Sequence, residues 1–318
     1  MPLPAGLAAV RAEVLRVGHE PTGDRALVWR SPPVTVRCQE VSSTAAAIGP
    51  GWSPTIPAIP TAGWRSGYYT IDIVHEGTGV RELDVAYIVV TDPGRSGDIL
   101  VKLGTNTYEA YNDWGGASLY GSAFDGLRGQ IVAFDRPTAP SFVEYDRFFV
   151  GWIEALAERN GWSVAYATNF DLHADPGRMD DYRLVIVPGH DEYWSKEEFD
   201  AFERRIFTRG QNTLFLGGNI AYWQVRYVDV NNAPGRPSFG RQMVCYKQLG
   251  DPVRRRVGDG EADLLATARF RDGLRRPETA LTGVGTQGWF QPRSDHDPAY
   301  PLHVARTDLP FFAGTGLQ

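Results

Sequence analysis

Hydrophobic and polar positions change their spacing along the chain, and this change divides the chain into two regions. In the segments WRSGYYTIDIV, from Trp64, and LDVAYIVV, from Leu83, apolar and polar residues alternate in the period-two pattern of half-buried strands. A turn at Glu76–Gly79 joins the two segments. We therefore predict a β-rich region over residues 1–95 that resembles part of a β-sandwich. Before residue 60 it consists of loop or linker with a few short strands, such as Val34–Val41.

After the turn-forming stretch TDPGRSG, the pattern becomes a repeated succession of strand, loop, helix and strand. This succession is typical of a parallel sheet with helices on its faces. We therefore predict an α/β region over residues 96–318. Because Phe311–Leu317 has the pattern of a strand that runs into a loop, we expect this domain to be truncated at its C-terminus. The predicted elements are strands at Asp98–Leu103, Ser163–Thr168, Leu184–Val187 and Asn212–Leu216, helices at Phe148–Asn160 and Lys196–Thr208, a long loop at Gly104–Tyr120, and candidate strands at Arg236–Gln248 and Leu281–Phe290.

The stretch LVIVPGHDEYWS is the most informative part of the α/β region. Its four aliphatic residues, Leu184–Val187, are typical of a strand that is buried on both faces. A Pro-Gly pair ends this run, and three titratable residues follow, namely His190, Asp191 and Glu192. Loops that leave the C-terminal ends of parallel strands form the crevice in which such sheets bind ligands. The stretch therefore predicts a functional site directly after the strand.

Two further polar loops follow predicted strands, at Asn106–Tyr120 and Gly217–Asn219. In a sheet with right-handed crossovers, these loops and His190–Tyr193 converge on one rim. Loop packing explains a single aromatic residue or glycine there equally well. It does not readily explain three adjacent titratable groups, and we therefore expect the rim to be functional. Asn219 stands where hydrolases of the glutamine-amidotransferase-like fold carry their nucleophile, in a tight turn after a strand.

Composition excludes several classes of function. The net charge of −6 argues against a nucleic acid or an anionic membrane as partner. No apolar run approaches the roughly 18–20 residues of a membrane span, and the N-terminus lacks the order of a secretory signal, so we expect a cytoplasmic protein. Cys38 and Cys245 lie far apart and form no CxxC, which argues against a disulfide framework or a thiolate metal site.

The chemistry of the rim depends on which nucleophile is available. No cysteine and no GxSxG follows a strand, so a hydrolase built on this chain would use water. Water has a pKa of about 15.7 and needs a base or a metal at neutral pH. The chain contains no HxxxH, HExxH or cysteine pair, which argues against a standard zinc site. Tyrosine and glutamate oxygens favour a hard, highly charged ion, and ferric iron meets this demand best.

Five segments of the chain carry a family resemblance. In order, WRSGYY, NTYEAYNDWGGASLY, VPGHDEYW, LFLGGNIAYWQVR and FFAGTGL resemble signature stretches of the C-terminal part of the N,N-dimethylformamidase large subunit and its relatives. The family is described as amidohydrolases with one iron held by two tyrosines and a glutamate. The resemblance therefore implies a glutamine-amidotransferase-like (flavodoxin-like) parallel sheet beside a β-sandwich, a mononuclear ferric cofactor, a small partner subunit and a homo-oligomer.

The resemblance also implies the ligands of the metal. The tyrosine of AYN is Tyr111, and the glutamate of GHDEYW is Glu192. The second tyrosine of the family, which follows Ser-Gly, best fits Tyr69. Tyr68 is the alternative, because the doubled tyrosine leaves the register open by one residue.

The predicted function is that of a metal-dependent amidohydrolase that cleaves a small amide, such as an N-alkylformamide, with metal-activated water. His190 would move protons between water and the leaving amine, or would orient Glu192 through a hydrogen bond. Asn219 would hold the substrate carbonyl or the water. The alternative is a non-catalytic domain for carbohydrate binding, small-ligand binding or assembly, which the aromatic loops favour. The expected apolar wall of the site consists of Trp114, Tyr193 and Trp223.

Overall fold

The computed structural model describes most of the chain. It forms two compact units, residues 1–285 and 286–318, and the elements below belong to the first. Among the described helices, none combines the length and the hydrophobicity needed to cross a membrane. The described residues are 9–21, 23–56, 58–92, 94, 96–121, 128–137, 142, 145–228, 240–247, 250–255, 265–285, 308, 310 and 313.

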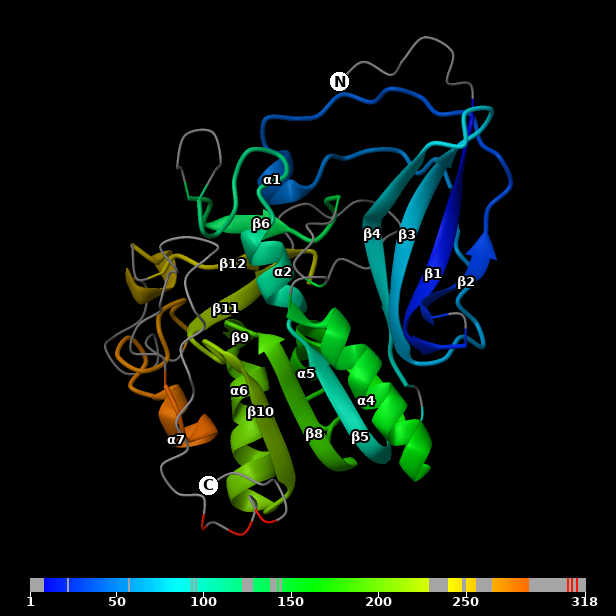
Figure 1. The fold of residues 1–318 in the computed structure, drawn as a ribbon. Helices are drawn as coiled ribbons and strands as arrows, with labels where there is room; N and C mark the ends of the chain where they lie inside the picture. The colour runs from blue at the N-terminus through cyan, green and yellow to red at the C-terminus, as the bar shows by residue number, and fades with distance from the viewer. Residues whose placement is uncertain are drawn as a thin grey trace, which may run out of the picture. The chain divides into compact units, whose positions relative to one another are not determined.

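An antiparallel sheet of four strands precedes the α/β elements, in the order β2-β1-β3-β4 (Figure 1). The two segments with period-two patterns form β3 and β4, as predicted. The first sixty residues contain more regular structure than expected, because they supply two long strands, whereas Val34 makes only an isolated bridge with Val10. The strands are β1 (Val10–Glu20), β2 (Gly23–Arg30), β3 (Gly67–His75) and β4 (Arg81–Val90), and a short helix, α1 (Ala45–Ile48), follows β2.

A parallel sheet of four strands, in the order β10-β8-β5-β7, forms the centre of the unit. Leu184–Val187 lies in β8, between two neighbours, as its apolar run predicted. The strand continues through the Pro-Gly pair to His190, because Pro188 and Gly189 still lie opposite residues of β10. The strands are β5 (Ser96–Leu103), β7 (Val164–Thr168), β8 (Asp181–His190) and β10 (Asn212–Gly218).

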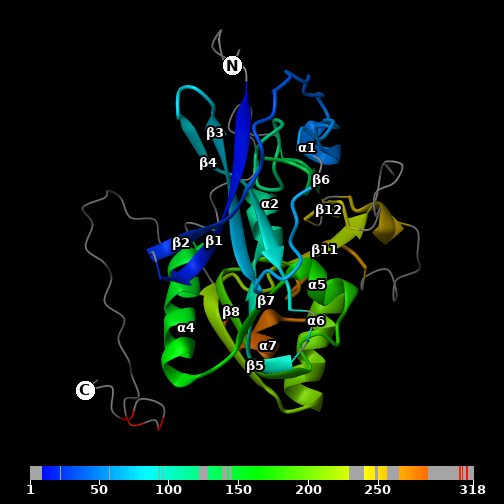
Figure 2. The same cartoon turned by 90° about the vertical axis from the view of Figure 1, so that its right-hand side faces the viewer.

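Helices cover both faces of the parallel sheet, and Figure 2 shows α4 on one side and α6 on the other. Val150 and Ile153 of α4 pack on one face with Val101, and Phe199 and Phe202 of α6 pack on the other face. The left-handed Gly161 ends α4, as its sequence predicted. The helices are α4 (Arg147–Asn160), α5 (Asn169–Ala174) and α6 (Lys196–Glu203), and a π-helical turn (Arg204–Thr208) continues α6.

The predicted loop Gly104–Tyr120 begins instead with a helix, α2 (Thr105–Tyr111). Its residues from Thr105 to Ala110 are all buried, so it has no apolar stripe opposite a polar one. The helix therefore gives no amphipathic pattern in the sequence. Its position between β5 and the rim nevertheless decides where Tyr111 lies.

The third sheet of the unit is a small mixed sheet with the strand order β6-β12-β11-β9. The predicted strand Arg236–Gln248 is realised only as β12, and the residues 229–239, 248 and 249 lie outside the described residues. The candidate strand Leu281–Phe290 is wrong at its start, because Leu281 lies in the helix α7, and residues 286–290 are outside the description. Of Phe311–Leu317, only residue 313 is described. The elements are β6 (Ile131–Ala133), β9 (Tyr193–Ser195), β11 (Trp223–Val228), β12 (Gln242–Val244), a 3-10 turn (Pro252–Arg255) and α7 (Glu278–Thr282).

Candidate functional site

The C-terminal ends of three neighbouring strands carry the polar segments that the sequence singled out. The helix α2 follows β5, the segment with Glu192 follows β8, and Asn219 follows β10. The last paired residues of β8 and β10 are His190 and Gly218. The predicted convergence on one rim therefore brings α2 and these two segments together.

Tyr111, His190 and Glu192 form a hydrogen-bonded group at this rim. The Tyr111 hydroxyl donates to Oε2 of Glu192 at 2.7 Å and lies 3.0 Å from Nε2 of His190. Nδ1 of His190 lies 3.0 Å from the carbonyl oxygen of Gly218. Because a carbonyl oxygen only accepts, Nδ1 carries a proton, and Nε2 faces the phenol and the carboxylate. The same carboxylate oxygen is 3.5 Å from Nε2.

Burial and the Glu192 carboxylate shift the pKa values of Tyr111 and His190. Burial raises the pKa of the Tyr111 phenol, and the adjacent Glu192 carboxylate raises it further, so the phenol stays protonated. Burial lowers the pKa of His190, but the hydrogen bond and the negative charge of Glu192 outweigh burial and raise it. The pKa of the imidazole therefore lies above its ordinary value, and the carboxylate favours the imidazolium form.

A fully buried ion cluster lies behind the group. Nζ of Lys102 forms ion pairs with Asp191 and with Glu198, the latter at 2.5 Å, and all three side chains are 0% exposed. Nδ2 of Asn169 lies 3.1 Å from an oxygen of each carboxylate. The ammonium also lies 4.3 Å from the ring centroid of Trp194. Asp191 therefore turns away from the rim, while its neighbour Glu192 turns towards Tyr111.

Hydrogen bonds connect this cluster to α2. Oδ1 of Asn169 accepts from the backbone N–H of Asn106 at 3.0 Å, and the Asn106 amide donates to the Tyr193 carbonyl at 2.8 Å. The hydroxyl of Thr107 accepts from the backbone N–H of Glu192 at 2.8 Å. These bonds fix the helix that carries Tyr111 against the segment that carries Glu192.

Tyr69, the third implied ligand, has other partners. Its hydroxyl donates to the carbonyl oxygen of Arg65 at 2.6 Å, and its ring stacks on Trp64 with centroids 4.9 Å apart. Within the described residues, no hydrogen bond or ring contact joins Tyr69 to Tyr111 or Glu192. The structure therefore brings two of the three implied ligands together.

Tyr68 lies elsewhere in the core. Its ring stacks on Phe142, with centroids 3.4 Å apart, and on Tyr87. In the described part of the chain it makes no hydrogen bond or ring contact with Tyr111 either. The choice between the two tyrosines therefore stays a prediction.

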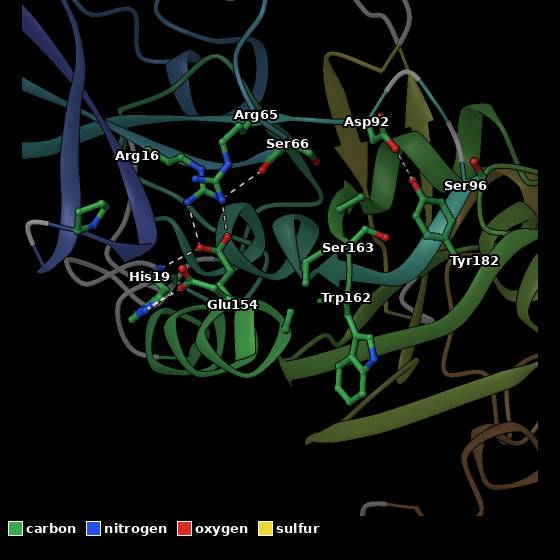
Figure 3. Close-up of a pocket in the computed structure, with 15 residues that line it drawn as sticks. Arg16, His19, Arg65, Ser66, Asp92, Ser96, Glu154, Trp162, Ser163 and Tyr182 are labelled. Carbon is green, nitrogen blue, oxygen red and sulfur yellow. Dashed lines mark hydrogen bonds and ion pairs between the residues drawn. The ribbon is translucent and has the colours of Figure 1, made fainter. Parts of the chain in front are cut away.

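Arg16 of β1 lies opposite Tyr69 in the antiparallel sheet and lines a cleft of about 650 Å³ (Figure 3). Its guanidinium forms an ion pair with Glu154 of α4 at 2.5 Å. The Tyr166 hydroxyl donates to the same glutamate at 2.8 Å. The cleft thus contains the ion pair that attaches the antiparallel sheet to α4, and Tyr111 and Glu192 do not line it.

The donor set fits an iron ion only in part. Oη of Tyr111 and Oε2 of Glu192, 2.7 Å apart, are close enough to bind one ion together. In the described residues, no group of three His, Cys, Asp or Glu side chains could hold a metal. With the Tyr69 hydroxyl bonded to Arg65, the third oxygen is missing. The arrangement as it stands therefore does not complete the implied iron site.

Asn219 adopts a left-handed backbone conformation, with φ of 54°. Asparagine adopts this conformation more readily than most residues other than glycine, so Asn219 suits the tight turn after β10. Of the expected apolar wall, Tyr193 lies near Tyr111, with ring centroids 6.5 Å apart, whereas Trp114 packs against Trp52.

Sequence reasoning did not single out three further residues of the rim. The ring of Tyr120 lies 4.9 Å from that of Tyr111, and the ring of Tyr145 lies 5.2 Å from that of His190. Nζ of Lys247 lies 4.9 Å from the centroid of Tyr120. A single lysine far along the chain gives no signal in the sequence. Only the fold places it at the rim.

Polar side chains at the C-terminal edge of a parallel sheet, beside an antiparallel sheet, define an α/β protein with a candidate catalytic site. The chain belongs to the family described as N,N-dimethylformamidase beta subunit-like, C-terminal, whose model matches residues 11–318. The resemblance seen in five segments is thereby confirmed, and it extends to the strands before Trp64. No curated protein matches the sequence.

Removal of the buried ammonium should destabilise the protein strongly. In Lys102→Met, two buried carboxyl groups lose their cation, and we expect the free energy of unfolding to fall by about 3–5 kcal/mol in urea titrations. Lys102→Met combined with Asp191→Asn should regain part of this loss, because a single buried carboxyl can remain protonated. The control Lys196→Met removes a partly exposed partner of Asp200 and should change little. Equal stability of Lys102→Met and Lys196→Met would contradict the role of the cluster.

Proposed function

We propose that this protein hydrolyses the carbon–nitrogen bond of small amides at the rim that carries Tyr111, His190 and Glu192. Family membership supports an amide hydrolase in the broad sense. The observation that carries the proposal is the meeting of a phenol, an imidazole and a carboxylate within 3.5 Å of one another. Acid–base catalysis uses a proton acceptor and a proton donor within hydrogen-bond reach of the reacting atoms, and this group supplies both.

Each side chain of the group has its own role in the hydrolysis. Nε2 of His190 takes a proton from water as the water oxygen attacks the carbonyl carbon, and the Glu192 carboxylate stabilises the imidazolium. The Tyr111 hydroxyl donates to the carbonyl oxygen as negative charge develops on it. His190 then gives its proton to the leaving nitrogen, the carbon–nitrogen bond breaks, and an amine and a carboxylic acid result. Asn219 supplies a second donor to the carbonyl oxygen.

The ferric cofactor stays a prediction from the family resemblance. Such an ion supplies Lewis-acid polarisation of a carbonyl when it is bound. Tyr111 and Glu192 are the side chains that we propose as its ligands, and Tyr69 would have to leave Arg65 to join them. The steps above use the protonated phenol of Tyr111 and therefore describe the site without the ion; with iron bound, Tyr111 would be a ligand, and the ion would polarise the carbonyl in place of the phenol.

Several finer features are part of the proposal. The strand order β10-β8-β5-β7 agrees with four strands of the flavodoxin-like order, which supports the glutamine-amidotransferase-like fold. The words "beta subunit-like" in the family description support a small partner subunit. We also propose the division near residue 95, a homo-oligomer and a cytoplasmic location, as the sequence predicted.

The function is tested by incubating the protein with N-methylformamide and measuring the methylamine that hydrolysis releases. Tyr111→Phe and Glu192→Gln should each lower kcat/KM by about 10²–10³, because each removes a hydrogen-bonding group at the reacting carbonyl or imidazole. The control Tyr182→Phe removes a phenol that donates to Asp92 at 3.1 Å, away from the rim, and should keep wild-type activity. The proposal fails if the wild-type protein hydrolyses no small amide, or if Tyr111→Phe is as active as the control.

Elemental analysis with a visible spectrum tests the cofactor separately. If iron is bound as proposed, the purified protein contains about one iron per chain and shows a tyrosinate-to-iron absorption band. Tyr111→Phe should lose both iron and band, whereas Tyr182→Phe should keep them. A colourless, metal-free and well-folded wild-type protein would exclude iron and leave the acid–base mechanism in place.

A further inference from the structure

Lys247 is a lysine that the fold holds inside the protein. Its exposed fraction is 8%, and its backbone adopts the left-handed conformation with φ of 50°. Nζ lies 4.9 Å from the ring centroid of Tyr120 and 5.2 Å from those of Tyr193 and Trp223. These three rings, together with Lys247, are called the lysine cage below. Lysine is seldom buried without a partner, so its position requires an explanation.

Two donors of the lysine cage have no acceptor among the described residues. Within the described residues, no carboxylate forms an ion pair with Lys247, and no hydrogen bond from its ammonium is found. The hydroxyl of Tyr193 is buried and has no hydrogen-bond partner in the described part of the chain either. Leaving one buried donor unsatisfied costs about 1–3 kcal/mol, and more if the group is charged. A buried phenol without an acceptor, beside an ammonium that forms no ion pair with a described residue, points to an acceptor group that arrives with a ligand.

The lysine cage adjoins the candidate active site. Tyr120 belongs to the cage, and its ring lies 4.9 Å from the ring of Tyr111. Tyr193 directly follows Glu192 in the chain, and its ring lies 6.5 Å from that of Tyr111. Tyr120 has an exposed fraction of 61%, so this side of the cage faces solvent. A small ligand whose amide lies at Tyr111 would therefore reach the cage with its other end.

A carboxylate matches the two free donors best. A buried ammonium needs a negative charge to offset its loss of hydration, and a neutral carbonyl supplies none. The two oxygens of a carboxylate can accept from the ammonium and from the phenol, and such charge-assisted bonds are about twice as strong as neutral ones. An uncharged N-alkyl group would leave both donors unsatisfied.

We propose that Lys247 and Tyr193 form a subsite for the carboxylate of an amide substrate. The preferred substrates are then small amides that carry a carboxylate, such as N-acyl amino acids, rather than uncharged alkyl amides. This inference rests on the proposed function for its substrate class. The binding subsite itself can be tested without activity.

Binding is measured first, by calorimetry with N-acetylglycine and with uncharged N-methylacetamide. We expect the wild-type protein to prefer N-acetylglycine, and we expect this preference to fall by about tenfold or more in Lys247→Met, because a charge-assisted bond is lost. Lys196→Met, which removes a surface lysine, should keep the wild-type preference. Equal affinity of the wild-type protein for both probes, or an unchanged preference in Lys247→Met, would overturn the subsite.

Tyr193→Phe provides a second test of the subsite if Lys247→Met does not fold. It keeps the ring of the lysine cage and removes only the unsatisfied hydroxyl, so the same preference should fall by a smaller factor. Circular dichroism establishes that each variant is folded. An unchanged preference in a folded Tyr193→Phe would remove the phenol from the subsite and so overturn the proposal in this form.

Hydrolysis separates this inference from the function on which it rests. The ratio of kcat/KM for N-formylglycine to that for N-methylformamide should exceed one and should fall in Lys247→Met, mainly through KM. Hydrolysis of both amides with equal kcat/KM would overturn the subsite and leave the amide hydrolase standing. Hydrolysis of neither, together with preferred binding of N-acetylglycine, would contradict the function and support the subsite.

Discussion

One buried ammonium, that of Lys102, holds together the parts of the protein that carry the candidate site. It lies between Asp191 and Glu198, and none of the three side chains is exposed. Burial raises the pKa of Glu198, and the ammonium opposes this effect. Two carboxyl groups without this cation would be forced to take up protons or to return to water. The position of the segment after β8 therefore depends on Lys102, and with it the direction in which Glu192 points.

The second constraint comes from the order of the strands. Because β5, β8 and β10 are neighbours, their C-terminal ends bring α2, Glu192 and Asn219 to one rim. The antiparallel sheet is attached elsewhere, through the ion pair between Arg16 and Glu154. The Tyr69 hydroxyl lies on that side and binds Arg65. The phenol, imidazole and carboxylate of the rim therefore form a complete hydrogen-bonded group without it.

Much of this arrangement could be predicted from the sequence, because continuous apolar runs identify buried strands. The apolar run in β8 predicted the parallel sheet, and the rule that strand ends converge predicted that the segments with Tyr111 and with His190–Glu192 meet. Only the family resemblance singled out Tyr111 and Glu192 as partners within those segments. The helix α2 was missed because distant residues such as Asn169 hold it, and its own sequence has no amphipathic period. The lysine cage was missed for a related reason. Lys247 meets its three rings only through tertiary contacts, which no local pattern in the sequence records.

The central claim is that Tyr111 and Glu192 act as one unit, and a double-mutant cycle on kcat/KM for a hydrolysed amide tests it most directly. If the phenol and the carboxylate act together, Tyr111→Phe combined with Glu192→Gln should be little worse than the more damaged single variant. Losses that add fully in free energy would contradict the claim. They would show that the 2.7 Å contact between the two side chains has no part in the reaction.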